Sequence, residues 1–146
     1  MATIMRRMNI ISRAEGIYRT DRLQEEELAA CHHSYILVLG RRPGISQEEL
    51  AREICVNKSN VTRNLAYLES KGYVERRPST QDRRVMLVYP TEKMQAVLPK
   101  VRQIVLDWND YLSAGFSGEE LAVFASVLDR MVERARAYRE RGEETP

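Results

Sequence analysis

Most of the chain has the hydrophobic periodicity of amphipathic helices. Apolar side chains recur at a spacing of three to four residues, which predicts helices that each bury one face. The expected helices span residues 4–19, 24–40, 46–53, 57–71, 91–114 and 117–138. Pro99 is expected to kink or interrupt the fifth of them, because proline lacks the N–H group of the helical hydrogen bond and its ring clashes with the preceding turn.

Several helix starts carry capping signals. Ser46 and Glu49 have the spacing of a capping box, in which the serine hydroxyl accepts from the backbone of the glutamate and the glutamate reaches back to the serine. Ser117 and Glu120 repeat this spacing. Asn57 is a favoured N-cap residue for the fourth helix. These signals place the starts of three helices.

Two short segments between the fourth and fifth helices alternate like strands. They are residues 73–77 and 84–89, and residues 78–82 between them have the composition of a turn. The resulting hairpin has a basic tip at Arg83 and Arg84. The order helix, short turn, helix, hairpin predicts a winged helix-turn-helix lobe in a mainly α fold with a small β-hairpin wing.

The composition is that of a globular protein. The chain has 146 residues, of which 43% are hydrophobic and 30% charged, enough for one domain with its own core. No run is long and apolar enough for a membrane span, and the N-terminal segment lacks the apolar core of a secretory signal. Two cysteines are too few for a disulfide framework. We therefore expect a cytoplasmic protein without a membrane partner or a cofactor.

The distribution of charge is more informative than its total. The whole chain has a net charge of only +2, but residues 57–88 hold seven basic and three acidic side chains. Such a concentration is typical of a surface that meets phosphates, although a solvated basic face has the same composition. Within a helix-turn-helix motif, the N-terminal end of the second helix contacts base edges in the major groove of DNA. The candidate DNA contacts there are Lys58, Ser59, Asn60, Thr62 and Arg63.

The wing offers a second set of contacts. Arg83 and Arg84 are placed to reach a neighbouring minor groove. Asp82 precedes them, and a carboxylate in that position is expected to orient an arginine by a charge-assisted hydrogen bond. The predicted partner is therefore double-stranded DNA.

Five segments together form a specific pattern: residues 43–51, 57–63, 68–76, 82–84 and 91–93. As a set they resemble the MarR family of bacterial transcriptional regulators. Pro90, Met94 and Cys55 depart from the residues usual in that family, and none of them is a proposed DNA contact.

The resemblance implies a homodimer whose subunits each present one winged-helix lobe. The lobe would span about residues 24–93, the dimerisation helices would lie in 1–20 and 95–141, and 142–146 would be a frayed tail of the single domain. It also implies that the DNA-reading role falls on Ser59, Asn60, Thr62 and Arg63 and the wing role on Asp82, Arg83 and Arg84.

Relatives of this kind commonly bind small aromatic or phenolic anions near the junction of the lobe and the dimerisation helices. The residues that could line such an effector pocket are Tyr18, His33, Tyr35, Trp108 and Tyr111. An aromatic set at helical spacing is also compatible with an ordinary core. Cys31 and Cys55 are candidates for redox sensing, which requires a lowered thiol pKa.

A metal site at Cys31-His32-His33 is not expected. Consecutive residues of a helix point about 100° apart, so these three side chains cannot converge on one ion. The chain also lacks the glycine-rich phosphate loop, the nucleophile elbow and the His-Glu-x-x-His motif of common enzyme classes. We therefore expect a non-enzymatic, sequence-specific regulator of transcription, a ligand-responsive repressor that binds a pseudo-palindromic operator as a homodimer. Two alternatives stay open: a redox- or metal-responsive regulator of the same fold, and a winged-helix module for protein interaction without an operator of its own.

Overall fold

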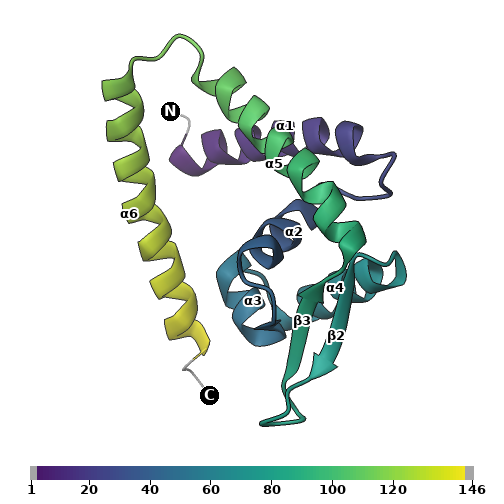
Figure 1. Ribbon diagram of the computed structural model, residues 1–146. Helices are drawn as coiled ribbons and strands as arrows, with labels where there is room; N and C mark the ends of the chain where they lie inside the picture. The colour runs from purple at the N-terminus through teal and green to yellow at the C-terminus, as the bar shows by residue number, and fades with distance from the viewer. Residues whose placement is uncertain (1–2, 144–146) are drawn as a thin grey trace. The chain divides into compact units, whose positions relative to one another are not determined.

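The computed structural model describes residues 3–143 and divides them into two units, with the boundary after Trp108. The first unit contains four complete helices, a small sheet and most of a fifth helix, and the second contains the rest of that helix and a sixth. The helices are α1 (Ile4–Leu23), α2 (His32–Arg41), α3 (Gln47–Ile54), α4 (Lys58–Ser70), α5 (Glu92–Ser113) and α6 (Gly118–Glu143). The predicted fold class, mainly α with a small β wing, is confirmed (Figure 1).

The sheet has three antiparallel strands, one more than the sequence predicted. Strands β2 (Val74–Pro78) and β3 (Met86–Pro90) form the expected hairpin, with Arg76 opposite Val88. The additional strand β1 (Ile45–Ser46) pairs with the other edge of β3, so the order is β1-β3-β2. A two-residue strand is too short to show alternation, which explains why it was missed. The tip of the hairpin projects away from the helices of its unit (Figure 1).

The expected helix over residues 24–40 is wrong over residues 24–31. The preceding helix α1 continues to Leu23, and a connecting segment separates it from the start of α2 at His32. The reason is local: Glu27 has the left-handed φ of 57°, and Leu28 donates its backbone N–H to Leu23 O at 3.1 Å, which closes α1. Leu28 is then buried, so the segment is anchored by a core residue.

The capping signals are confirmed. Glu49 N donates to Ser46 Oγ at 3.1 Å, and Ser46 N donates to the Glu49 carboxylate at 3.2 Å. Between α3 and α4, Cys55 adopts a left-handed φ of 64°, a conformation in which glycine carries no steric penalty. The bounds of α3 and α4 lie within about one residue of those expected.

Helix α5 continues through Pro99, so the expected interruption is wrong. A proline removes one helical hydrogen bond, whereas Leu98, Val101 and Ile104 keep the same helix face buried in the core. Its start is capped as expected, because Met94 N donates to Thr91 Oγ1 at 3.3 Å.

The core of the first unit lies among α2, α3, α4, α5 and the sheet. Its fully buried side chains include Leu39, Leu50, Leu65, Leu68 and Val88. Apolar side chains stay exposed along α1, among them Ile10 and Ile17.

In the second unit, α6 begins with the predicted capping box, in which Glu120 N donates to Ser117 Oγ at 3.2 Å. Phe124 and Val127 are exposed on this helix. Of the expected frayed tail, residues 144–146 lie outside the described residues. None of the described helices is both long enough and apolar enough to span a membrane.

Candidate nucleic-acid interface

Helix α4 has one buried face and one exposed polar face. Val61, Leu65 and Leu68 are buried in the core. The four candidate DNA contacts Lys58, Ser59, Thr62 and Arg63 are all exposed at the N-terminal end of the same helix. The apolar spacing fixes this rotation of the helix, because burying the stripe turns the polar side chains outward.

The wing tip is a tight turn held by Asp82. The backbone N–H of Arg84 donates to the Asp82 carboxylate at 3.0 Å, and two guanidinium nitrogens of Arg84 donate to it at 3.1 Å each. These bonds lower the pKa of Asp82, so the carboxylate is ionised at neutral pH. The side chain of Arg84 is 90% exposed, so its guanidinium is oriented by Asp82 and still faces solvent.

The start of α4 and the wing share a concave surface. Lys58, Thr62 and Arg84 line one cavity of about 250 Å³, together with Ser46, Gln47 and Glu48 at the start of α3. The geometry therefore brings together side chains from both predicted contact regions, which lie more than twenty residues apart in the chain.

Basic side chains of the lobe fall into two groups. Arg76 is paired with Glu69 at 2.5 Å, and Arg77 with Glu75 at 2.6 Å. Lys58, Arg63, Arg83 and Lys93, in contrast, have no acidic partner within ion-pair distance among the described side chains. Three of these four cations lie at the start of α4 and at the wing tip, and Lys93 lies at the start of α5.

Asn60 differs from the other candidate contacts of α4. It is half-buried, and its Oδ1 accepts hydrogen bonds from Tyr35 Oη at 2.7 Å and from Asn64 Nδ2 at 3.0 Å. Ser59 is exposed, but its hydroxyl donates to the N-cap side chain of Asn57 at 2.9 Å. The structure therefore separates Asn60, which is bonded inward, from the outward-facing Lys58 and Arg63.

Comparisons with known proteins agree with this architecture. A family model described as "MarR family" matches residues 32–86, from the start of α2 to the first residue of β3. An uncharacterized HTH-type transcriptional regulator, YybA of Bacillus subtilis (strain 168), is 28% identical over 97% of this chain and 97% of its own. The crystal structure of the transcriptional regulator SlyA has a TM-score of 0.92 at 26% identity and covers 95% of this chain and 98% of its own. The chain is similar to MarR-family regulators over nearly its whole length.

MarR proteins are winged helix-turn-helix transcriptional regulators, so this similarity agrees with the expectation that the chain is not an enzyme. A MarR-family regulator from Listeria monocytogenes, solved as a complex with a 26mer DNA, has the same fold. Its TM-score is 0.88 at 23% identity, and it covers 97% of both chains.

Of the five residues expected to line an effector pocket, Tyr18, His33, Tyr35 and Trp108 lie in the first unit and Tyr111 lies in the second. Tyr18 and Trp108 are in ring contact, with centroids 5.0 Å apart. His33 contacts Arg19, whereas Tyr35 is buried and bonded to Asn60. Tyr111 belongs to the second unit and is exposed. Within the first unit, Tyr18 and Trp108 thus form one aromatic pair, and His33 lies against Arg19, the residue that follows Tyr18.

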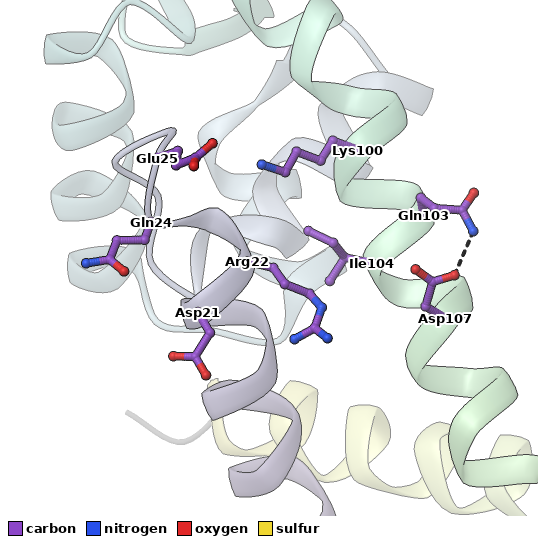
Figure 2. Close-up of a pocket in the computed structure, with 8 residues that line it drawn as sticks. All are labelled: Asp21, Arg22, Gln24, Glu25, Lys100, Gln103, Ile104 and Asp107. Carbon is purple, nitrogen blue, oxygen red and sulfur yellow. Dashed lines mark hydrogen bonds between the residues drawn. The ribbon is translucent and has the colours of Figure 1, made fainter.

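A larger cavity of about 520 Å³ lies between the end of α1 and α5 (Figure 2). Its lining is mostly charged, with Arg22 and Lys100 beside three carboxylates, and Ile104 is its one aliphatic residue. Arg22 is held against the Tyr18 ring at 3.5 Å, and Gln103 donates to Asp107 at 2.8 Å. Local sequence patterns did not indicate this cavity, because its two walls are about eighty residues apart.

The two histidines point to different surroundings. His32 Nδ1 accepts from Ala29 N at 2.9 Å and its ring stacks on Tyr67, whereas His33 contacts Arg19 and Ala30 O. In the described part of the chain, no group of histidine, cysteine and acidic side chains could hold a metal ion. Cys31 and Cys55 are free and exposed, and Cys31 Sγ donates to Asn64 Oδ1 at 3.6 Å.

His33 makes stability depend on pH. Burial, with a smaller contribution from Arg19, lowers its pKa from 6.5 to about 4. Between these values the unfolded chain binds a proton that the folded protein does not, so the free energy of unfolding falls as the pH is lowered from 6.5 toward 4. We expect His33→Gln to remove this part of the dependence, on the order of 1–3 kcal/mol. Urea unfolding of both proteins at pH 7 and pH 4.5 measures it, and parallel losses in the two proteins would contradict the assignment.

Proposed function

We propose that this protein is a MarR-family, sequence-specific DNA-binding regulator of transcription in the cytoplasm. The observation that carries the proposal is the joint surface of α4 and the wing, where Lys58, Thr62 and Arg84 line one cavity and Lys58, Arg63 and Arg83 have uncompensated charge. Helix α4 would lie in the major groove, with Arg63 placed to pair with guanine and Lys58 with phosphate. The Listeria regulator with the same fold was solved in complex with a 26mer DNA, which supports DNA as the partner.

The functional unit we propose is a homodimer. Residues 1–20 and 95–141 would supply the dimerisation helices and residues 24–93 the DNA-binding lobe of a single domain. Exposed apolar side chains on α1 and on α6, such as Ile17 and Phe124, support an interface along these helices. Two lobes related by a two-fold axis would meet half-sites about 34–36 Å apart, in a pseudo-palindromic operator.

We further propose that the protein is a repressor released by a small aromatic or phenolic anion. Arg19 supports this class of effector, because it is buried and its Nε has no hydrogen-bond partner in the described structure. It lies against His33 and directly follows Tyr18, whose ring contacts Trp108. An anion with an aromatic ring could bond to this guanidinium and pack on that pair.

A redox-responsive regulator is the second candidate function. It is favoured by one contact, that of the exposed Cys31 thiol with Asn64 on α4. Oxidation of this thiol would alter a bond to the DNA-reading helix.

Duplex titrations at increasing salt test the proposed function against a protein-interaction module. A DNA-binding lobe with several phosphate contacts loses affinity steeply as salt rises, with a linear dependence of log affinity on log salt. Absence of duplex affinity even at 50 mM salt, together with salt-insensitive binding to another protein, would favour the interaction module.

Arg84→Ala tests the wing. Removing its guanidinium should weaken duplex binding uniformly by about 0.5–1.5 kcal/mol and reduce the salt slope by about one. Arg41→Ala is a suitable control, because Arg41 is an exposed arginine paired with Glu53 rather than with the wing. An unchanged affinity and slope for Arg84→Ala would remove Arg84 from the DNA contacts.

A further inference from the structure

Helix α4 has a third face, distinct from its apolar stripe and from its outward polar face. This face consists of Asn60, Asn64, Tyr67 and Lys71, which follow one another at intervals of four, three and four residues. Such intervals place the four side chains in one row along the helix. Each of these four residues has a hydrogen-bond or ion-pair partner in one short segment of the chain.

That segment is residues 27–35, the connection after α1 and the first turn of α2. Tyr35 Oη donates to Asn60 Oδ1 at 2.7 Å, and Cys31 Sγ donates to Asn64 Oδ1 at 3.6 Å. Further along α4, Tyr67 Oη donates to the backbone oxygen of Glu27 at 2.5 Å. Lys71 pairs with the carboxylate of the same Glu27 at 2.8 Å. The row is thus bonded at both ends and between them.

The bond at the N-terminal end is the most sheltered. Tyr35 is 1% exposed and Asn64 is 8% exposed. The buried partner is the Tyr35 hydroxyl, and a buried donor that loses its acceptor is costly, because water cannot replace the missing bond. Asn64 Nδ2 donates both to Asn60 Oδ1 at 3.0 Å and to the backbone oxygen of Asn60 at 2.9 Å, so the Asn60 side chain is bonded inward by Tyr35 and by Asn64.

We propose that segment 27–35 sets the position of α4 on DNA, with Tyr35 as the positioning residue that acts through Asn60. In this account Asn60 reads no base through Oδ1, because that oxygen is already engaged by Tyr35 and Asn64. Lys58 lies in the first turn of α4 and Arg63 in the next. The rotation of this end of the helix therefore decides where both cationic groups meet the duplex. The predicted effect of Tyr35 on DNA affinity rests on the proposed function.

The same segment touches the surroundings of Arg19 on its other side. Arg19 Nη1 donates to Ala30 O at 3.2 Å and contacts His33. Segment 27–35 therefore contacts both the buried guanidinium and the DNA-facing helix.

Tyr35→Phe, Asn60→Ala and the double variant test the inference. Affinity is measured for the duplex selected by the wild-type protein and for a scrambled duplex of equal length and composition. We expect each single variant to bind the selected duplex about two- to tenfold more weakly, the size of one hydrogen bond, with scrambled binding and the salt slope unchanged. The double variant should lose no more than Asn60→Ala alone, since both act through one bond.

Tyr73→Phe is the matched control. It removes a buried tyrosine hydroxyl from the same unit, one that donates to Glu26 O at 2.8 Å rather than to a side chain of α4. Tyr73→Phe should lose about as much stability as Tyr35→Phe. Its ratio of affinities for the selected and the scrambled duplex should stay that of the wild type. The positioning role would be overturned if Tyr35→Phe kept the wild-type ratio of affinities for the two duplexes, or if the losses of affinity of the single variants added in the double variant. Asn60 would then be a direct base contact.

Hydrogen exchange of the free protein separates this inference from the proposed function. Tyr35→Phe should speed exchange at the amides of the first two turns of α4, and Tyr73→Phe should not. If the wild-type protein does not distinguish the two duplexes, the proposed function fails, and the exchange result still decides whether Tyr35 positions α4. Unchanged exchange in Tyr35→Phe would overturn the inference.

Discussion

Replacing Arg63 with alanine is expected to weaken binding to the selected operator by about 1–3 kcal/mol and to relax the choice of base at one position. The reason is that its guanidinium is exposed on the outward face of α4 and has no acidic partner among the described residues, so the fold does not depend on it. Competition titrations against operators with single base changes measure both effects.

Arg102→Ala is the control for this variant. Arg102 is an exposed arginine on α5, and replacing it with alanine removes the same charge at a distance from the α4 surface. An equal loss on operator and scrambled duplexes for Arg63→Ala would mean a phosphate contact rather than a base contact. No loss on either duplex would contradict the placement of α4 in the major groove.

The second large effect is on stability. Leu65→Ala should lower the free energy of unfolding by about 2–5 kcal/mol, because Leu65 is 0% exposed and its removal leaves a cavity beneath α4. Urea unfolding followed by circular dichroism measures the change. Thr62→Ala, on the exposed face of the same helix, should stay within about 0.5 kcal/mol of the wild type. A loss below about 1 kcal/mol for Leu65→Ala would contradict the close packing of α4 on the core.

Local signals in the sequence were sufficient for the DNA-facing elements. The Ser46 capping box, the Asn57 cap and the apolar stripe of α4 each involve residues within about two helical turns of one another, and each fixed a bound or a buried face correctly. The wing hairpin likewise follows from two adjacent strands joined by a turn. Patterns of this kind carry their own physical cause, so no distant partner is needed to interpret them.

The features that the sequence did not predict depend on distant partners. The segment after α1 has apolar residues at nearly helical spacing, but the left-handed Glu27 and its bonds to α4 hold it out of a helix. Asn60 has the residue type of a base contact, and only the approach of Tyr35, 25 residues earlier, turns its oxygen inward. Strand β1 exists because β3 offers a free edge to Ile45. Long-range contacts decided all three.

The most direct test of the account is selection of genomic DNA fragments by the purified wild-type protein at moderate salt, followed by footprinting of the recovered fragments. A homodimer that presents two α4 helices predicts recovery of a short inverted repeat, with protected half-sites about 34–36 Å, or one helical turn, apart. Recovery of bulk DNA without a common sequence, with binding that disappears as salt rises, would contradict sequence-specific regulation and leave only phosphate contact.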